Sequence, residues 1–214
     1  MLTLTDGTSV TVDEYLEAAK EKHENTVYYA TDKALQSQYI SMFDAEGIKV
    51  ALFSHPIDTQ FATLAEQYME GVKFVRVDSD APDILKGDGE TGENETLKEL
   101  FSDVLGEKVA LRFDAFKDAS VPAILNVSEQ SRRMEEMMKM YGMSETEGMS
   151  ESTLVLNTSS PLVTKLSKKA QSDPDTAKQT ASYLYKLALL SQKKFTADEM
   201  QSFMKDSFDI LMKL

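Results

Sequence analysis

The sequence predicts α/β plus α+β architecture: a small three-layer α/β subdomain with a parallel sheet, then an α+β domain ending in a helical hairpin. Three features support this prediction. Apolar strands alternate with amphipathic helices in the first part, and runs of strands precede runs of helices in the second. Between them, residues 87–94 (GDGETGEN) hold three glycines and three acidic residues, which favours a linker. We therefore predict domains at residues 1–90 and 91–214.

In the first domain, three apolar runs are the predicted strands: residues 27–30, 48–53 and 74–77. Helices separate them, so the crossovers should be right-handed and the strands parallel. Asp58 is expected to cap the helix that precedes the third strand. The face that this helix should bury consists of Phe61, Leu64, Ala65 and Tyr68.

The second domain is predicted from strands at residues 109–113, 123–127 and 153–157, followed by helices. The first of these helices, at 161–171, has a proline near its start, where the missing N–H costs nothing. Side chains that can bond the free N–H groups of a first helical turn mark other helix starts in the chain. These capping residues are Thr11 with Glu14, Asp173, and Thr196 with Glu199.

Composition excludes several classes of protein. The chain has 214 residues, 42% of them hydrophobic, and no cysteine, which excludes disulfides and thiolate metal sites. No apolar run approaches the ~18 residues of a membrane span, and no signal-peptide pattern is present, so we expect a cytoplasmic protein. The net charge of −13 argues against nucleic-acid binding. Residues 161–194, with seven lysines and two aspartates, form either a solvated face or a docking surface for an acidic partner.

The first functional candidate is a methionine-rich segment at residues 128–143, which contains five of the twelve methionines in the chain. Met134, Met137, Met138 and Tyr141 fall on one helical stripe, two further methionines extend it to one flank, and charged residues occupy the other face. Methionine suits a surface that must accept many apolar shapes, so we predict client binding here. Alternatively, the stripe is ordinary core, and the domain only dimerises. The predicted client-binding residues are Met134, Met137, Met138, Met140, Tyr141 and Met143.

The second candidate is the C-terminal pair of helices, which carries much apolar surface at a chain end. Two copies of this hairpin could pair by two-fold symmetry as a four-helix bundle, giving a homodimer. The alternative is that the hairpin packs onto its own domain. The predicted interface consists of Ala181, Leu184, Leu187, Ala188, Met200, Phe203, Met204, Phe208 and Leu211.

Signals for catalysis are sparse, and we predict neither a catalytic nor a metal site. The two histidines, His23 and His55, are far apart in the sequence, and the standard metal-binding and nucleophile motifs are absent from it. The alternative function is a small α/β enzyme or ligand-binding domain. Its site would lie near His55 and Asp58, where the second strand ends.

Several segments resemble the Hsp90 chaperone family, and its bacterial type, high-temperature protein G, in particular. Residues 27–58 (VYYATDKALQSQYISMFDAEGIKVALFSHPID) look like the last α/β subdomain of the family's middle domain. Three further segments are similar to the family's C-terminal dimerisation domain: VLGEKVALRF, the methionine-rich segment, and LVLNTSSPLVTKL with Asn157 and Pro161. The sequence departs from the family at Ser120-Val121-Pro122, where Ser-Pro is usual.

The resemblance implies a chaperone fragment that dimerises and binds partly unfolded client proteins. It implies ATP and Mg²⁺ only for the full-length chaperone, whose nucleotide-binding domain we do not find in this sequence. We therefore expect no cofactor and no ATPase activity of the chain itself. We expect neither nucleic acid nor a membrane as a partner.

Overall fold

The computed structural model divides the chain into two compact units. Unit 1 consists of Met1–Leu85 and Val127–Ser150, and unit 2 of Lys86–Asn126 and Glu151–Leu214. The first division lies close to the predicted boundary at residue 90, but residues 127–150 group with unit 1 rather than with the second predicted domain. The residues that the structure describes are 1–79, 85–89, 91–92, 94–105, 109–128, 131, 133–134, 137–138 and 152–212.

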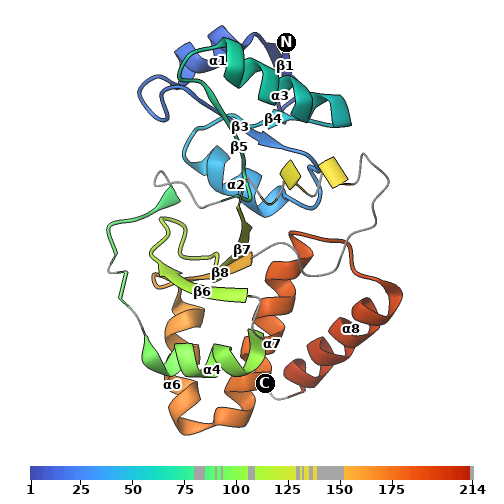
Figure 1. Cartoon of the computed structure of the whole chain (residues 1–214). Coiled ribbons are helices and arrows are strands. Elements are labelled where there is room, and N and C mark those ends of the chain that lie inside the picture. The colour runs from blue at the N-terminus through green and yellow to red at the C-terminus, as the bar shows by residue number, and fades with distance from the viewer. Residues whose placement is uncertain are drawn as a thin grey trace. The chain divides into compact units, whose positions relative to one another are not determined.

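Unit 1 alternates strands and helices along the chain (Figure 1). Its elements are β1 (Leu2–Thr3), β2 (Ser9–Val10), α1 (Val12–Ala19), β3 (Thr26–Ala30), α2 (Ser37–Ala45), β4 (Ala51–Leu52), α3 (Pro56–Tyr68) and β5 (Lys73–Arg76). The strands β4, β3 and β5 form the parallel sheet that the sequence predicts, and their order in it is β4-β3-β5. The antiparallel hairpin of β1 and β2 adjoins β4 through a bridge between Leu4 and Ala51.

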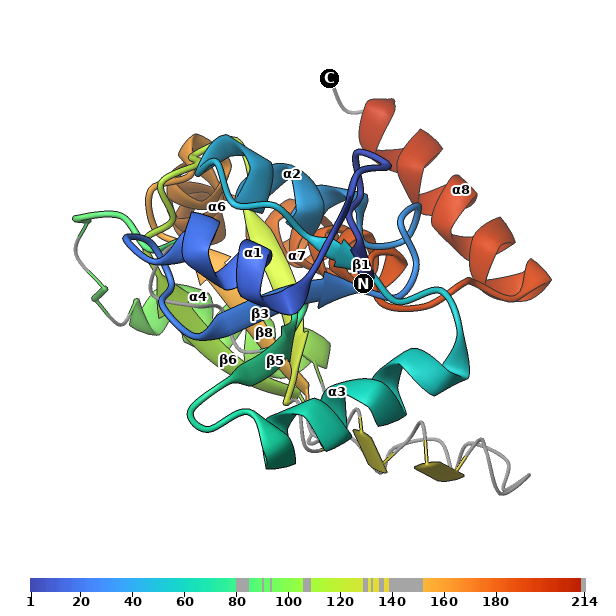
Figure 2. The ribbon, with the colours of Figure 1, turned by 90° about the horizontal axis from the view of Figure 1, so that it is seen from above.

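Helices cover both faces of this sheet, because successive residues of β3 point to opposite sides. Val27 and Tyr29 belong to the core cluster that includes Ala62 and Ala65 of α3. The ring of Tyr28 instead lies 4.6 Å from that of Phe43 in α2. Figure 2 shows α2 and α3 on opposite sides of the strands. Unit 1 therefore has the three layers that the sequence predicts.

Unit 2 combines a small sheet with helices. Its elements are α4 (Glu95–Leu105), β6 (Val109–Asp114), β7 (Ala123–Val127), β8 (Ser152–Asn157), α6 (Pro161–Ser172), α7 (Pro174–Leu190) and α8 (Ala197–Leu211). The strand order is β6-β8-β7, and β6 runs parallel to β8. Helices α4, α6 and α7 share one apolar core with the sheet, while α8 lies beside α7 (Figure 1).

The helix caps predicted at Thr11, Asp173 and Thr196 are present with the expected geometry. The N–H of Glu14 donates to Thr11 Oγ1 (3.1 Å), and that of Thr11 donates to Glu14 Oε2 (2.8 Å). Thr196 and Glu199 repeat this capping box at α8, and Asp173 accepts a backbone N–H at the start of α7. These local signals could be recognised from the sequence because both partners lie within one helical turn.

Asn157, the last residue of β8, organises the loop that follows β6. It is completely buried. Its Oδ1 accepts hydrogen bonds from the N–H groups of Phe116 (2.9 Å) and Ser159 (3.0 Å). Its Nδ2 donates to the carbonyl oxygens of Asp118 (2.9 Å) and Val121 (2.7 Å). One amide therefore satisfies four backbone groups of unit 2.

Replacing this amide should destabilise unit 2 strongly. We expect Asn157→Ala to lower the free energy of unfolding by about 2–4 kcal/mol, because buried backbone groups lose their partners. Urea unfolding followed by circular dichroism measures the change. Ser120→Ala is the matched control, since Ser120 is exposed in the same loop and bonds only Asp118 locally. An Asn157→Ala variant as stable as this control would contradict the assignment.

Candidate protein-binding surfaces

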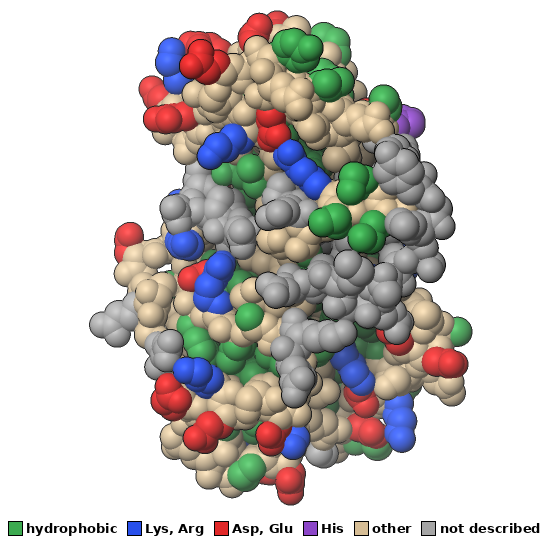
Figure 3. Space-filling view, viewed as in Figure 1, with side chains coloured by type: hydrophobic (Ala, Val, Ile, Leu, Met, Phe, Trp, Pro, Cys, Tyr) green, Lys and Arg blue, Asp and Glu red, His purple; other side chains and the backbone are tan. Residues whose placement is uncertain are grey.

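The outward face of α3 carries large apolar side chains in contact with solvent. Sequence periodicity predicted that Phe61, Leu64, Ala65 and Tyr68 would be buried together; this is wrong for three of them. The helix turns Ala62 and Ala65 toward the sheet instead, and such small side chains let it lie close to the strands. The exposed apolar residues of α3 are Ile57, Phe61, Leu64 and Tyr68. Figure 3 shows apolar side chains at the surface over this helix.

Two predicted client-binding methionines are also exposed in unit 1. Met134 is 45% exposed and Met137 is 49% exposed, whereas the core residue Met42 is 4% exposed. Met138 is half-buried, so it contributes less to the surface. The exposure of Met134 and Met137 argues against their being ordinary core. The remaining predicted positions, Met140, Tyr141 and Met143, lie outside the described residues.

Arg133 attaches this methionine segment to the body of unit 1. Its guanidinium donates to both carboxylate oxygens of Glu66 in α3, at 2.8 and 3.0 Å, and to the carbonyl oxygen of Phe74, at 3.1 Å. Burial of Glu66 by itself would raise the pKa of its carboxyl. Hydrogen bonds from Arg133 and the Phe74 N–H, with the charges of Arg133 and Lys73, outweigh burial and hold that pKa below its usual value. Glu66 therefore stays ionised and paired at neutral pH.

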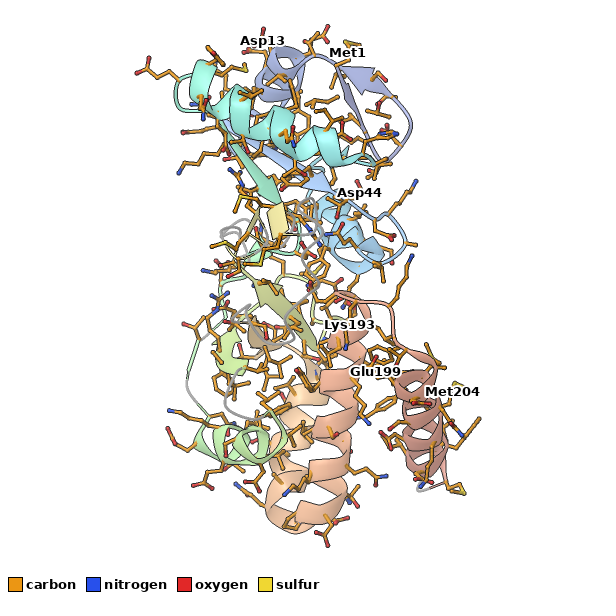
Figure 4. All side chains as sticks on the ribbon, turned by 45° about the vertical axis from the view of Figure 1, so that its right-hand side comes forward. Met1, Asp13, Asp44, Lys193, Glu199 and Met204 are labelled. Carbon is orange, nitrogen blue, oxygen red and sulfur yellow. The ribbon has the colours of Figure 1, made fainter. Side chains whose placement is uncertain are left out.

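In unit 2, the outer face of α8 is the second exposed apolar surface. All fifteen residues of α8, Ala197–Leu211, are described, and none of them is buried. Figure 4 shows Met204 on the side of α8 away from α7. The exposed apolar residues of this surface, which we call the α8 face, are Met200, Met204, Phe208, Leu211 and Met212, with Leu187 of α7 also exposed.

Three residues predicted at the dimer interface lie instead in the core of their own chain. Ala181, Leu184 and Ala188 are at most 3% exposed and pack with α4, α6 and the sheet. They follow one face of α7, and that face is the one turned toward the body of unit 2. These residues are therefore not available to a second copy.

Polar and aromatic contacts fix α8 to α7. The half-buried ring of Phe203 stacks on Tyr183 with a centroid distance of 5.2 Å, and Ser207 Oγ donates to the Tyr183 hydroxyl at 3.1 Å. Lys186 and Asp206 form an ion pair between the two helices. Phe203, predicted at the interface, thus serves mainly to join the hairpin within one chain.

The lysine-rich stretch of unit 2 is largely neutralised by its own chain. Ion pairs link Lys169 to Asp173, Lys178 to Asp103, Lys186 to Asp206, and Lys193 to Glu199. Figure 4 shows Lys193 and Glu199 close together where α7 leads into α8. These pairs favour the solvated-face interpretation over a docking surface for an acidic partner.

His55 and Asp58, the alternative site, form the start of α3. The N–H of His55 donates to Asp58 Oδ2 at 2.9 Å, and the His55 side chain is 77% exposed. Asp58 is thus the third helical residue of a capping pair, rather than the cap that we predicted. An exposed imidazole beside a helix start lacks the enclosure that ligand sites usually have.

Other candidates for small-molecule chemistry are weak among the described residues. A hollow between α4, α7 and α8 is lined mainly by polar groups, and two of its acids, Asp103 and Asp206, are already paired with lysines. Within the described ranges, no group of three or more His, Cys, Asp or Glu side chains could hold a metal ion. The same residues include no helix long and apolar enough to cross a membrane.

Comparison with known proteins identifies the family. The Hsp90 protein family matches the chain over residues 3–214. The chain belongs to the Hsp90 family. The chaperone protein HtpG of Bacteroides fragilis is 33% identical over 181 residues, which are 76% of this chain and 27% of that protein. HtpG of Porphyromonas gingivalis is 32% identical over 78% of this chain and 27% of its own length.

The Hsp90 match extends along nearly the whole chain in a more distant relative. HtpG of Shewanella amazonensis is 29% identical over 96% of this chain and 33% of its own length. The chain thus spans about a third or less of the curated relatives it matches. These relatives confirm the family that the sequence segments predicted, and they support a chaperone function.

Sequence reasoning missed two features of this Hsp90-family chain. The exposed face of α3 was missed because its apolar period predicts a buried stripe equally well. Arg133 was treated only as part of a charged helix face, since its partner Glu66 is 67 residues away in the sequence. A capping box can be recognised in the sequence because its two residues lie within one helical turn. A pair of residues 67 positions apart leaves no such local pattern.

The half-buried His23 should make the stability of unit 1 depend on pH. Burial lowers its pKa from the usual 6.5, the Thr26 carbonyl oxygen 2.6 Å from Nδ1 opposes this, and the Lys22 charge adds to the lowering. As pH falls through 6.5, the unfolded chain therefore takes up a proton that the folded chain resists. Stability that is present at about pH 7.5 should decrease toward about pH 5.5.

The measurement is urea unfolding by circular dichroism at these two pH values. We expect His23→Gln to lose less stability on acidification than the unsubstituted chain, because this proton uptake is gone. His55→Gln, which removes an exposed ring, is the matched control and should keep the original pH dependence. Equal pH dependence in the two variants would contradict the prediction.

Proposed function

We propose that this chain is the client-holding and dimerising part of an Hsp90-family chaperone. Its chaperone character rests on the family and on its HtpG relatives. The finer assignment is supported chiefly by one observation, the exposure of Met134 and Met137 on the same unit as the exposed apolar face of α3. Together these residues form the proposed client surface: Ile57, Phe61, Leu64, Tyr68, Met134 and Met137.

The chemistry of this surface suits partly unfolded polypeptides. Methionine side chains are unbranched and polarizable, so they adapt to apolar groups of different shape. Phe61 and Tyr68 add flat aromatic area, which contributes to binding without requiring one particular partner sequence. Large apolar side chains in water usually mark an interaction site. An unfolded client offers the exposed apolar residues that would cover them.

The α8 face is proposed to bind a second copy of the chain. Two α7–α8 hairpins related by a two-fold axis would cover each other's apolar residues as a four-helix bundle. The burial of Ala181, Leu184 and Ala188 limits the proposed contact to Leu187, Met200, Met204, Phe208 and Leu211. Pairing would hold two client surfaces in one molecule, so a long client could bind both at an increased effective concentration.

The proposed role of the chain is binding, and no catalytic step is assigned to its residues. We assign neither ATP nor Mg²⁺ to any residue of the chain, and we place the nucleotide-dependent activity of the family in parts of the longer relatives that the alignment does not cover. The role of the chain is then binding alone: it shields apolar segments of a client and joins two protomers.

The client surface is tested by replacing Met134 and Met137 with serine. We expect the concentration that half-suppresses aggregation of a chemically denatured client, followed by light scattering, to rise about fivefold to tenfold, since apolar contact area is lost. The melting temperature should hardly change, because both side chains are exposed. Leu162→Ser, which removes an exposed apolar side chain of α6 in unit 2, should hold clients normally. A large loss of stability would show that the two methionines are core.

The dimer is tested by placing charges on the α8 face with Met204→Asp and Phe208→Asp. Burying these carboxylates against a second copy is costly, so the dissociation constant should rise about 100-fold or more. Sedimentation equilibrium over a range of concentrations measures it. The matched control, Gln201→Asp with Lys205→Gln, changes the net charge equally on exposed positions and should remain dimeric. Leu184→Asp is unsuitable because it would disrupt the core.

Either of two results would refute this interface. One is a chain that stays monomeric at every concentration. The other is a Met204→Asp/Phe208→Asp variant that dimerises as well as the control.

A further inference from the structure

Among the described residues, two side chains rather than another strand cover the outer edge of the sheet in unit 1. Strand β5 lies at the edge, and the Lys73 N–H donates inward to Asn25. The next N–H, that of Phe74, therefore points outward. It donates to Glu66 Oε1 at 2.8 Å, and the Phe74 carbonyl oxygen accepts from Arg133 at 3.1 Å.

These bonds tie three separate parts of the chain at one point. Glu66 comes from α3, Phe74 from β5, and Arg133 from the methionine segment. Arg133 and Glu66 also bond each other through both carboxylate oxygens. Bidentate charge-assisted pairs fix direction as well as distance, because the guanidinium and carboxylate planes must align. The side chains are 29% and 23% exposed, so water competes less than at an open surface.

We call the Arg133–Glu66 pair, with its bonds to Phe74, the clamp. Because Arg133 lies next to the exposed methionines in the sequence, the clamp also affects where they lie. Met134 is the next residue, and Met137 follows one helical turn later; the described residues between 131 and 138 are helical. Glu66 lies on α3 between Leu64 and Tyr68. Fixing Arg133 on Glu66 therefore holds the two exposed methionines close to α3, the helix on which Glu66 lies.

We propose that Arg133 and Glu66 are positioning residues, which hold Met134 and Met137 against α3 so that the two apolar groups act as one client surface. This inference rests on the proposed function of that surface. Arg133 and Glu66 themselves do not contact the client. The pair acts through the methionines, by removing the freedom of the segment that carries them.

Stability and client holding together distinguish a purely structural role of Arg133 and Glu66 from a positioning role. If the clamp only protected the edge of β5, breaking it would lower stability and leave client holding unchanged in the folded chain. If it positions the methionines, breaking it would loosen the segment locally and weaken client holding. Hydrogen exchange of the amides in residues 131–138 distinguishes local loosening from global unfolding.

The test is a double-mutant cycle of Arg133→Gln and Glu66→Gln in the full chain. Glutamine at position 66 keeps an oxygen that can accept the Phe74 N–H, so the sheet edge remains satisfied while the ionic pair is lost. We expect each single variant to raise amide exchange in residues 131–138 about fivefold to tenfold and to weaken client holding about threefold to fivefold. The double variant should resemble the singles, because the two side chains act as one unit.

Arg112→Gln is the matched control, since Arg112 also pairs with a carboxylate, Asp114, at 2.9 Å, but in unit 2. It should alter neither readout. Unchanged exchange in Arg133→Gln would overturn the clamp. Faster exchange with unchanged client holding would overturn the positioning role.

The proposed function has a separate readout. If Met134→Ser/Met137→Ser holds clients normally, the client surface itself is wrong, whereas the exchange data still decide whether the clamp exists.

Discussion

The feature on which the structure depends most is the burial of small residues in place of large ones where α3 meets its sheet. Ala62 and Ala65 face the strands, so the larger apolar residues of the same helix remain in water. An apolar side chain in water forgoes about 1.5–3 kcal/mol that complete burial would provide. Because α3 leaves several such residues exposed, a partner that covered them would gain this burial free energy.

In unit 2, large apolar residues are also left exposed, but they lie mainly on a helix outside the core. The core of unit 2 is completed by α4, α6 and α7, and α8 adds no buried residue to it. The aromatic stack of Phe203 on Tyr183 and the Lys186–Asp206 pair hold α8 in place, while its methionines and Phe208 face outward. Within each unit, the residues that form the core are thus separate from the large apolar residues that remain exposed. Substitutions can then address one group without the other.

How much could be predicted from the sequence depended on how far apart the interacting residues lie. The capping boxes at Thr11 and Thr196 were predicted correctly, because their partners are three residues away. The strands of the two three-stranded sheets were also predicted, because apolar runs are local, whereas the two-residue strands β1 and β2 were not. Which face of α3 is buried, and which residues of α7 form the core, depends on packing against distant elements. The grouping of residues 127–150 with unit 1 likewise follows from contacts such as Arg133–Glu66, which no periodicity encodes.

The attachment of α8 has a consequence for the order in which unit 2 comes apart. Helix α8 adds no side chain to the shared core, and its contacts with the rest of unit 2 include the Phe203–Tyr183 stack and the bonds of Lys186 to Asp206 and Ser202. We therefore expect α8 to detach before the core of unit 2 unfolds. The capping box of Thr196 and Glu199 satisfies the first turn of α8 from within the helix, so α8 can stay helical when it detaches. Its detachment would separate the α8 face from unit 2 without exposing the core that α4, α6 and α7 share with the sheet.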